Sequence, residues 1–201
     1  MSLIIPANSL AGGGFAIDNS LRFNSGSSDY LTRTPATVTN RKTWTWSGWV
    51  KRSKIGTAVS ERGGVFTAGI LNTDKTDLYF YSDTIYLTGK ESDVTTVAVR
   101  PSQLFRDVSA WYHIVCAVDT TQATASDRVK FYINGNIVTD FATEVYPSIN
   151  DDLFMNNTSL HHIGRIGYTS DNYFAGYMAD TYFIDGQALT PTDFGEFDAD
   201  S

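Results

Sequence analysis

The chain has little cysteine and histidine and no long apolar run. No stretch of the 201 residues approaches the ~20 consecutive apolar residues of a membrane-spanning helix, so we expect no membrane insertion. The one cysteine, Cys116, lies in an alternating apolar run, which predicts a buried thiol and leaves the redox compartment open. The three histidines, His113, His161 and His162, lack the cysteine and carboxylate neighbours of a zinc site.

Basic residues are also scarce. Lysine and arginine number 15 against 22 aspartates and glutamates, which gives a formal net charge of −7. The basic residues form no stripe along the sequence, so we expect no nucleic-acid partner. The start, Met-Ser-Leu-Ile-Ile-Pro, has no basic n-region, and its apolar run is too short for a secretory signal peptide. We therefore expect any extracellular role to be reached by another route, such as release by lysis.

The motifs of common enzyme classes are missing. Retaining glycosidases need two carboxyl groups about 5–5.5 Å apart. A run such as Glu-x-Asp-x-x-Glu, which would carry them on one strand, does not occur here. The four glutamates, Glu61, Glu91, Glu144 and Glu196, are scattered in polar segments. There is no nucleophile elbow, phosphate loop or dinucleotide fingerprint, although spacing alone leaves a Ser-His-Asp triad open. We therefore expect a non-enzymatic protein that requires no cofactor.

The sequence is rich, by contrast, in apolar residues that alternate with period two, most clearly within residues 109–138. Residues 112–118 are apolar on both faces, which predicts a central strand covered on both sides. In residues 129–133 apolar and polar side chains alternate, as in a strand with one wet face. Asn134-Gly135 then predicts a tight hairpin turn.

Short strands of this kind recur along the chain, separated by turn residues. They are expected at residues 21–23, 30–32, 43–51, 65–71, 78–81, 85–87, 97–104, 161–164 and 173–184. Residues 89–95 are interpreted as a polar loop, and Pro101 indicates an edge or bent strand. Thr190-Pro191 with Asp193 predicts one helix of one to two turns near the C-terminus. Because strands and helices do not alternate, the expected fold is all-β, a two-sheet antiparallel jelly-roll sandwich.

This domain is expected to occupy residues 19–201, because 201 residues suit one domain, and to follow a glycine-rich arm of residues 1–18. The arm carries apolar side chains that would not gain by staying in water: Leu3, Ile4, Ile5, Phe15 and Ile17. Two interpretations stay open. The arm packs loosely over its own domain, or it docks into a neighbouring subunit or a larger assembly.

Three segments, in order, resemble the laminin-G-like, concanavalin A-like jelly-roll domains. Residues 43–51, Thr-Trp-Thr-Trp-Ser-Gly-Trp-Val-Lys, are similar to the early aromatic strand of this family. Residues 110–135 resemble its Trp-x-His strand and the following strand that ends in Asn-Gly. Residues 174–191 resemble its closing strand and helix entry. The resemblance covers residues 19–197 and implies the jelly-roll sandwich.

The chain also resembles a narrower group, the jelly-roll proteins of bacteriophages, in residues 5–9, 20–24, 29–31 and 183–190. This resemblance implies a protein of the virion surface, either a tail-fibre adhesin or a capsid decoration. It would attach to a host surface glycan through its rim loops, or to other virion proteins through its arm. Analogy also implies a homo-oligomer, with a trimer as the guess. The alternative is a secreted or cell-surface carbohydrate-binding module outside any virion.

Glycan recognition needs an aromatic face bordered by polar groups. Four aromatic residues on strands or beside loops are candidates: Trp49, Tyr86, Tyr132 and Tyr173. The competing interpretation is that each is an ordinary half-buried strand aromatic. For Trp49, semi-buried packing and an exposed stacking platform both stay open.

The family resemblance also suggests calcium, which the wider family binds with aspartates and backbone carbonyls at the sandwich rim. Asp151, Asp152 and Asp171 lie on expected loops and are the candidate ligands, although a hard cation needs six to eight oxygens. The family often has two adjacent acids after its closing strand, whereas here Ala179 takes the first place and Asp180 remains. The alternative is that the three aspartates are plain turn residues.

Overall fold

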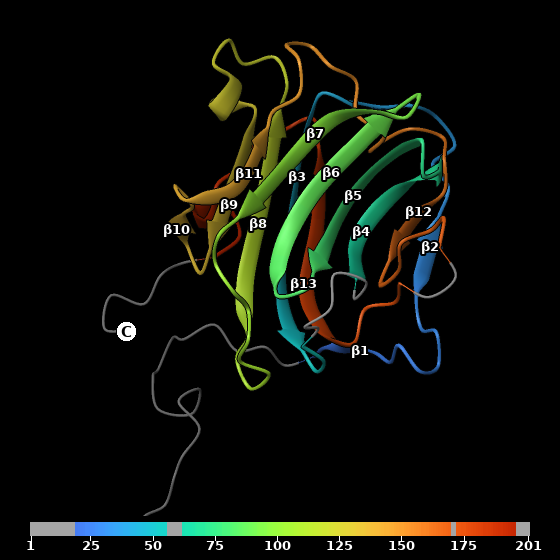
Figure 1. Cartoon of the computed structure of the whole chain (residues 1–201), viewed down its shortest axis with the longest axis vertical. Coiled ribbons are helices and arrows are strands. Elements are labelled where there is room, and N and C mark those ends of the chain that lie inside the picture. Colours follow the sequence, from blue (N-terminus) through green and yellow to red (C-terminus); the bar gives the residue numbers. More distant parts are fainter. Residues whose placement is uncertain (1–18, 56–61, 170–171, 196–201) are drawn as a thin grey trace, which may run out of the picture.

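A computed structural model describes residues 19–55, 62–169 and 172–195, which form thirteen strands in two antiparallel sheets packed face to face (Figure 1). The six-stranded sheet has the order β1 (Leu21–Phe23), β13 (Gly176–Asp185), β3 (Thr43–Arg52), β8 (Tyr112–Asp119), β9 (Val129–Ile133), β10 (Asn136–Ile137). The seven-stranded sheet has the order β11 (Phe141–Val145), β7 (Val94–Pro101), β6 (Thr84–Glu91), β5 (Asp74–Tyr81), β4 (Arg62–Leu71), β12 (His161–Ile163), β2 (Leu31–Arg33). The predicted all-β sandwich is confirmed. The predicted arm, residues 1–18, lies outside the described residues.

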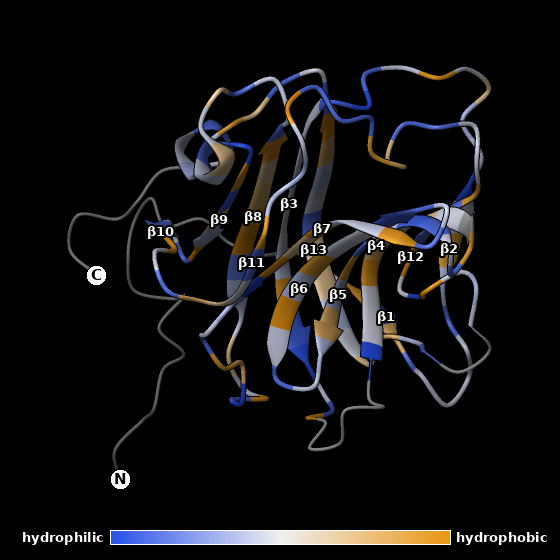
Figure 2. Ribbon diagram, turned by 45° about the horizontal axis from the view of Figure 1, so that its top comes forward, coloured by the Kyte–Doolittle hydropathy of each residue, from blue (hydrophilic) through white to orange (hydrophobic). Residues whose placement is uncertain are grey.

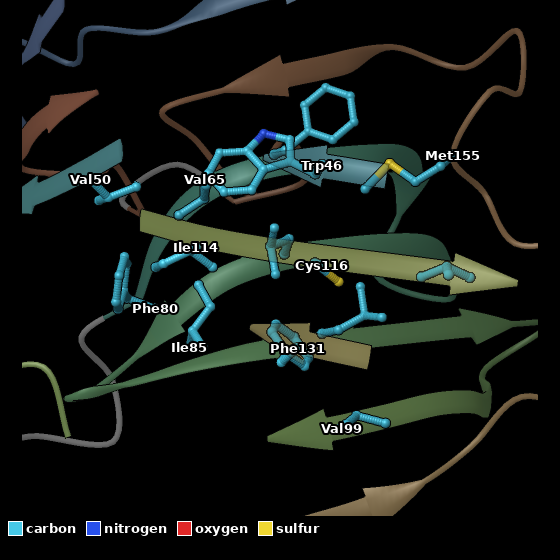
Figure 3. Packing of buried hydrophobic residues seen from close by; sticks show 14 of the residues in the cluster. Trp46, Val50, Val65, Phe80, Ile85, Val99, Ile114, Cys116, Phe131 and Met155 are labelled. Carbon is cyan, nitrogen blue, oxygen red and sulfur yellow. The ribbon is translucent and has the colours of Figure 1, made fainter. Parts of the chain in front are cut away.

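The hydrophobic core lies between the two sheets and takes alternate residues from most strands (Figure 3). Hydrophobic residues accordingly recur along β4, β7 and β8 (Figure 2). Among the largest fully buried side chains are Trp44, Trp46, Leu78, Phe80, Ile85, Leu87, Ile114 and Phe131. Cys116 belongs to this core, and its burial raises the pKa of its thiol. The thiol is therefore an apolar packing group at neutral pH, as the sequence predicted.

Strand β8 is covered on both faces, as the sequence predicted. Ile114 and Cys116 face the core, while Val115 on the opposite face is also fully buried. The segment after β13 helps to cover this opposite face. It is held there by Thr45 on the neighbouring β3, whose hydroxyl donates a 2.7 Å hydrogen bond to the Gln187 carbonyl and accepts one of 2.8 Å from the Leu189 N–H.

The hairpin turn and the C-terminal helical turn form where the sequence predicted them. Asn134 and Gly135 adopt φ values of 47° and 81°, the left-handed pair that a tight hairpin requires. The predicted C-terminal helix is one 3₁₀ turn, η3 (Pro191–Asp193), with the Thr190 N–H donating a 2.8 Å hydrogen bond to the Asp193 carboxylate. None of the described residues forms a helix long and apolar enough to cross a membrane.

Two local predictions are wrong. Residues 89–95 form the paired ends of β6 and β7 and the turn between them, where Ser92 and Asp93 have φ values of 50° and 66°. The segment is polar because these strand ends are largely exposed. Of the two alternatives for Pro101, the edge strand is wrong, since β11 pairs with β7 on the far side, and the bent strand stays a prediction. Pro101 is the last residue of β7, where a missing N–H costs the ladder little.

Candidate functional site

Three tyrosines gather on the outer face of the seven-stranded sheet. On β5, Leu78 and Phe80 point into the core, so alternation turns Tyr79 and Tyr81 outward. Tyr86 on β6 lies opposite Tyr79 in the strand register and faces the same way. The ring centroid of Tyr86 is 5.7 Å from that of Tyr79 and 5.9 Å from that of Tyr81. Tyr79 is buried, while Tyr81 and Tyr86 are half-buried, so two rings of a continuous aromatic surface reach solvent.

Two arginines from the flanking strands border these rings. Arg62, the first residue of β4, lies opposite Tyr81, and its guanidinium carbon is 5.6 Å from the Tyr81 ring centroid. The guanidinium carbon of Arg100 on β7 is 5.5 Å from the same centroid and 5.6 Å from that of Tyr86. These distances are in the range of cation–π attraction. We call Arg62, Tyr79, Tyr81, Tyr86 and Arg100 together the tyrosine–arginine face.

The hydroxyls of Tyr79 and Tyr86 are neutral at physiological pH. Burial raises the pKa of Tyr79 and of Tyr86, although the nearby Arg62 and Arg100 guanidinium groups act in the opposite direction. A phenol that stays protonated both donates and accepts hydrogen bonds. The face therefore combines apolar ring surface with neutral hydroxyls and cationic donors.

A short hairpin of residues 164–169 and 172–174 covers the outer face of the sheet beside the tyrosine–arginine face. We call it the 164–174 hairpin. The Thr67 hydroxyl on β4 donates a 2.9 Å hydrogen bond to the Arg165 carbonyl. Gly64 makes this approach feasible, because a Cβ there would lie 2.2 Å from the Arg165 carbonyl carbon. The hairpin thus limits the open part of the sheet to the side where β5, β6 and β7 carry the tyrosine–arginine face.

Beneath the hairpin lies a buried polar network. The Asp77 carboxylate, in a residue that is 1% exposed, is 3.0 Å from the Lys75 ammonium and accepts a 2.7 Å hydrogen bond from the Tyr168 hydroxyl. Lys75 also donates to the Tyr168 hydroxyl. Burial raises the pKa of Asp77, against the opposing pull of the Lys75 charge. This carboxylate holds the hairpin to the sheet and does not face solvent.

The structure does not bring the four predicted aromatic residues together. Tyr86 lies on the tyrosine–arginine face, and Tyr173 lies in the 164–174 hairpin, with its ring centroid 5.4 Å from the Arg165 guanidinium carbon. Trp49 and Tyr132 lie on the outer face of the other sheet.

Trp49 is half-buried, and its ring centroid lies 5.1 Å from that of His113. The Nε2 atom of His113 is 2.9 Å from the Ser47 hydroxyl, and burial lowers the His113 pKa. Among the described residues, no carboxylate contacts this pair, so a Ser-His-Asp triad does not form there.

The predicted calcium ligands lie in the loop between β11 and β12, except for Asp171, which lies outside the described residues. The Asp151 carbonyl accepts a 2.8 Å hydrogen bond from the Thr120 hydroxyl, and the Asp152 carbonyl accepts one of 2.9 Å from Arg41. Within the described ranges, no three His, Cys, Asp or Glu side chains are grouped to hold a metal ion. Calcium binding stays a prediction.

Four residues of the tyrosine–arginine face were absent from the sequence-based candidates. The alternation Leu78, Tyr79, Phe80, Tyr81 already contained the signal for two of them, since it places both tyrosines on the face opposite the core. No comparable pattern in the sequence pointed to Arg62 or Arg100. Each becomes a neighbour of Tyr81 only through the pairing of separate strands.

Comparison with solved structures shows the same fold at low sequence identity. A heptameric pentraxin from Limulus polyphemus is 17% identical, with a TM-score of 0.54 over 82% of this chain and 73% of that chain. Tailspike protein 2 of bacteriophage CBA120 is 16% identical, with a TM-score of 0.59 over 87% of this chain and 26% of that chain. The carbohydrate-binding module of a Ruminococcus gnavus sialidase, bound to α2,3-sialyllactose, is 12% identical, with a TM-score of 0.51 over 82% of this chain and 96% of that chain.

The chain spans less than half the length of several such structures. No curated protein sequence matches it significantly. A family model, described as the concanavalin A-like lectin/glucanases superfamily, matches residues 25–193. This match confirms the resemblance found in the sequence, and the chain belongs to the concanavalin A-like lectin/glucanase superfamily.

Proposed function

We propose that the protein binds a glycan on the tyrosine–arginine face and acts as a non-enzymatic attachment domain. The observation that carries this proposal is the contact of three tyrosine rings on neighbouring strands, two of them half-exposed, beside guanidinium groups. Sugar rings present apolar C–H surfaces that stack on aromatic faces, while their hydroxyls need donors and acceptors around the stack. The face offers both.

The same face supports binding without hydrolysis. Retaining glycosidases need two carboxyl groups about 5–5.5 Å apart, and inverting ones need two about 6.5–9.5 Å apart. Asp77, the carboxylate that the described residues present on this side of β5, is 1% exposed and engaged by Lys75 and Tyr168. A carboxylate fixed in this way under the hairpin is unsuited to protonate or attack a glycosidic bond.

A glycan array tests the proposal directly, with wild-type protein, Tyr81→Ala and Tyr132→Ala compared on every glycan. Tyr132 is the matched control because it is also half-buried on a strand but lies on the opposite sheet. We expect binding to at least one glycan that weakens about tenfold or more in Tyr81→Ala and stays unchanged in Tyr132→Ala. If only Tyr132→Ala lost binding, the binding site would lie on the other sheet and the proposal would be wrong.

We further infer that the domain works on the surface of a bacteriophage particle, as a tail-fibre adhesin or capsid decoration. The sequence resemblance to phage jelly-roll proteins supports this location, and the fold shared with a phage tailspike is consistent with it. In this proposal the apolar residues of the arm join the domain to other virion proteins, and the protein is a homo-oligomer, with a trimer expected.

Deletion of residues 2–17 tests the role of the arm. We expect the shortened chain to fold, with an unchanged melting temperature, and to fail to enter particles or to oligomerise. Incorporation at the wild-type level would contradict the assembly role. Detection of the protein in culture supernatant but never in purified particles would favour the alternative, a secreted or cell-surface carbohydrate-binding module.

A further inference from the structure

The described charged side chains around the tyrosine–arginine face are mostly basic, whereas the whole chain is acidic. The chain carries a formal charge of −7. Among the described residues beside this face, however, Lys75, Arg62, Arg100 and Arg165 are basic, and Asp77 is ion-paired with Lys75. In the described part of the chain, none of the three arginines forms an ion pair. Within the described residues, the arginines beside the half-buried tyrosines thus have no carboxylate partner.

The two arginines of the tyrosine–arginine face also keep their hydrogen-bonding capacity. Neither the Arg62 nor the Arg100 guanidinium group donates a hydrogen bond to any other described residue, and the Nε of Arg100 is buried without a partner. Both guanidinium groups are instead held against the Tyr81 ring, at 5.6 and 5.5 Å from its centroid. Guanidinium N–H groups without a protein acceptor gain a partner when an acceptor arrives with a ligand.

We propose that the glycan bound on this face is anionic, carrying a carboxylate or sulfate group that Arg62 and Arg100 bind while its sugar ring stacks on Tyr81. This inference rests on the proposed glycan-binding function and narrows it to one chemical class. Guanidinium groups suit both anions, because their N–H donors form paired hydrogen bonds with two oxygens of one group. The negative charge of the whole chain opposes a long polyanion, so a short acidic glycan fits better than a nucleic acid.

The test measures affinity by calorimetry for matched glycan pairs: sialyllactose against lactose, oligogalacturonate against neutral galacto-oligosaccharide, and a sulfated galactan oligosaccharide against its desulfated form. We expect at least one acidic member to bind about tenfold or more tightly than its neutral partner. The first two pairs report on carboxylate and the third on sulfate. Raising the salt concentration should weaken binding of the acidic member and leave binding of the neutral one nearly unchanged.

Variants separate local recognition from overall charge. Arg62→Gln and Arg100→Gln should each weaken binding of the acidic glycan about tenfold and remove its advantage over the neutral partner. Arg22→Gln is the matched control, because it removes the same charge from an exposed position on β1 in the other sheet. Arg100→Lys keeps the charge but loses the paired geometry, so its affinity should fall between those of wild type and Arg100→Gln. Melting temperatures show whether each variant is folded.

The outcomes distinguish this inference from the function on which it rests. Equal affinity for acidic and neutral partners, with Tyr81→Ala still disruptive, would overturn the anionic ligand and leave glycan binding in place. An equal loss of affinity for the acidic glycan in Arg22→Gln and Arg100→Gln would also overturn the anionic ligand. Absence of binding to every member of the panel would overturn both. Tighter binding of single-stranded DNA than of any acidic glycan would replace the glycan with a nucleic acid.

Discussion

The Tyr168 hydroxyl donates a hydrogen bond of 2.7 Å to the Asp77 carboxylate, and this bond joins the 164–174 hairpin to β5. Replacing Tyr168 with Phe keeps the ring and removes the donor from a carboxylate that is 1% exposed. We expect Tyr168→Phe to lower the free energy of unfolding by about 1.5–3 kcal/mol, the usual contribution of a hydrogen bond to a charged group. Urea denaturation gives this value.

Tyr182→Phe is the control for this substitution, because Tyr182 is 46% exposed and its ring stacks on Phe194. Its hydroxyl group should contribute little, so the control should unfold at the wild-type urea concentration. If Tyr168→Phe is as stable as Tyr182→Phe, the hydrogen bond to Asp77 does not fasten the hairpin.

Gly64 lies where the hairpin approaches the sheet closely. An alanine Cβ there would lie 2.2 Å from the backbone carbonyl carbon of Arg165, which no side-chain rotation relieves. We expect Gly64→Ala to lower the free energy of unfolding by about 1–3 kcal/mol and to make residues 164–174 easier to cleave in limited proteolysis. Gly195→Ala, where a Cβ meets nothing within 4 Å, should leave both measurements unchanged. Wild-type stability in Gly64→Ala would show that the hairpin does not depend on this contact.

Acid should destabilise the fold through its buried histidines. Burial, aided by the charge of Arg165, lowers the pKa of His162 to about 4, and burial also lowers the pKa of His113 and of His161. The unfolded chain takes up a proton near pH 6.5, whereas folded His162 stays neutral until about pH 4. Stability from His162 is therefore fully present above about pH 6.5 and lost between about pH 6.5 and 4, by at most about 3 kcal/mol.

The measurement is the slope of unfolding free energy against pH, compared between wild type and His162→Gln. We expect a shallower slope in the variant, in which His113 and His161 still contribute. Packing lost in the substitution lowers the free energy of unfolding by the same amount at every pH. It therefore does not change the slope, which reports the titration alone. An identical slope in the two proteins would refute the role of His162.

Glycan binding should survive removal of calcium. The recognition groups of the proposed site are tyrosine rings, hydroxyls and guanidinium groups, none of which needs a cation. We expect an excess of EDTA to leave the affinity of the best glycan unchanged, as measured by calorimetry. Abolition of binding by EDTA and its recovery with calcium would instead locate recognition near the loop that holds Asp151 and Asp152.

Local alternation predicted part of the core. The sequence of β8 is apolar on both faces, and the strand is covered on both, with Cys116 buried. Such predictions succeed because neighbouring side chains on a strand point to opposite sides whatever the strand pairs with. The ordered motifs then identified the superfamily, although no residue in them carries the proposed site.

The proposed site was only partly predictable because it is assembled across strands. Tyr86 was a candidate from the sequence, but its contacts with Arg100 and Tyr79 come from three adjacent strands. Bulges also shift the pairing, at residues 64–66 of β4 and 89–90 of β6. A register shift of one residue turns a side chain to the other face, so no rule of spacing along the chain places these groups together.

The central claim is that ligand binds on the outer face of the seven-stranded sheet, and tyrosine-ring NMR tests it most directly. With ring-labelled tyrosines assigned by substitution, the best glycan from the array is titrated into the full chain. We predict that the ring signals of Tyr81 and Tyr86 shift in proportion to saturation, while those of Tyr132 and Tyr177 on the other sheet stay in place. Shifts of Tyr132 and Tyr177 with Tyr81 and Tyr86 unmoved would contradict the account.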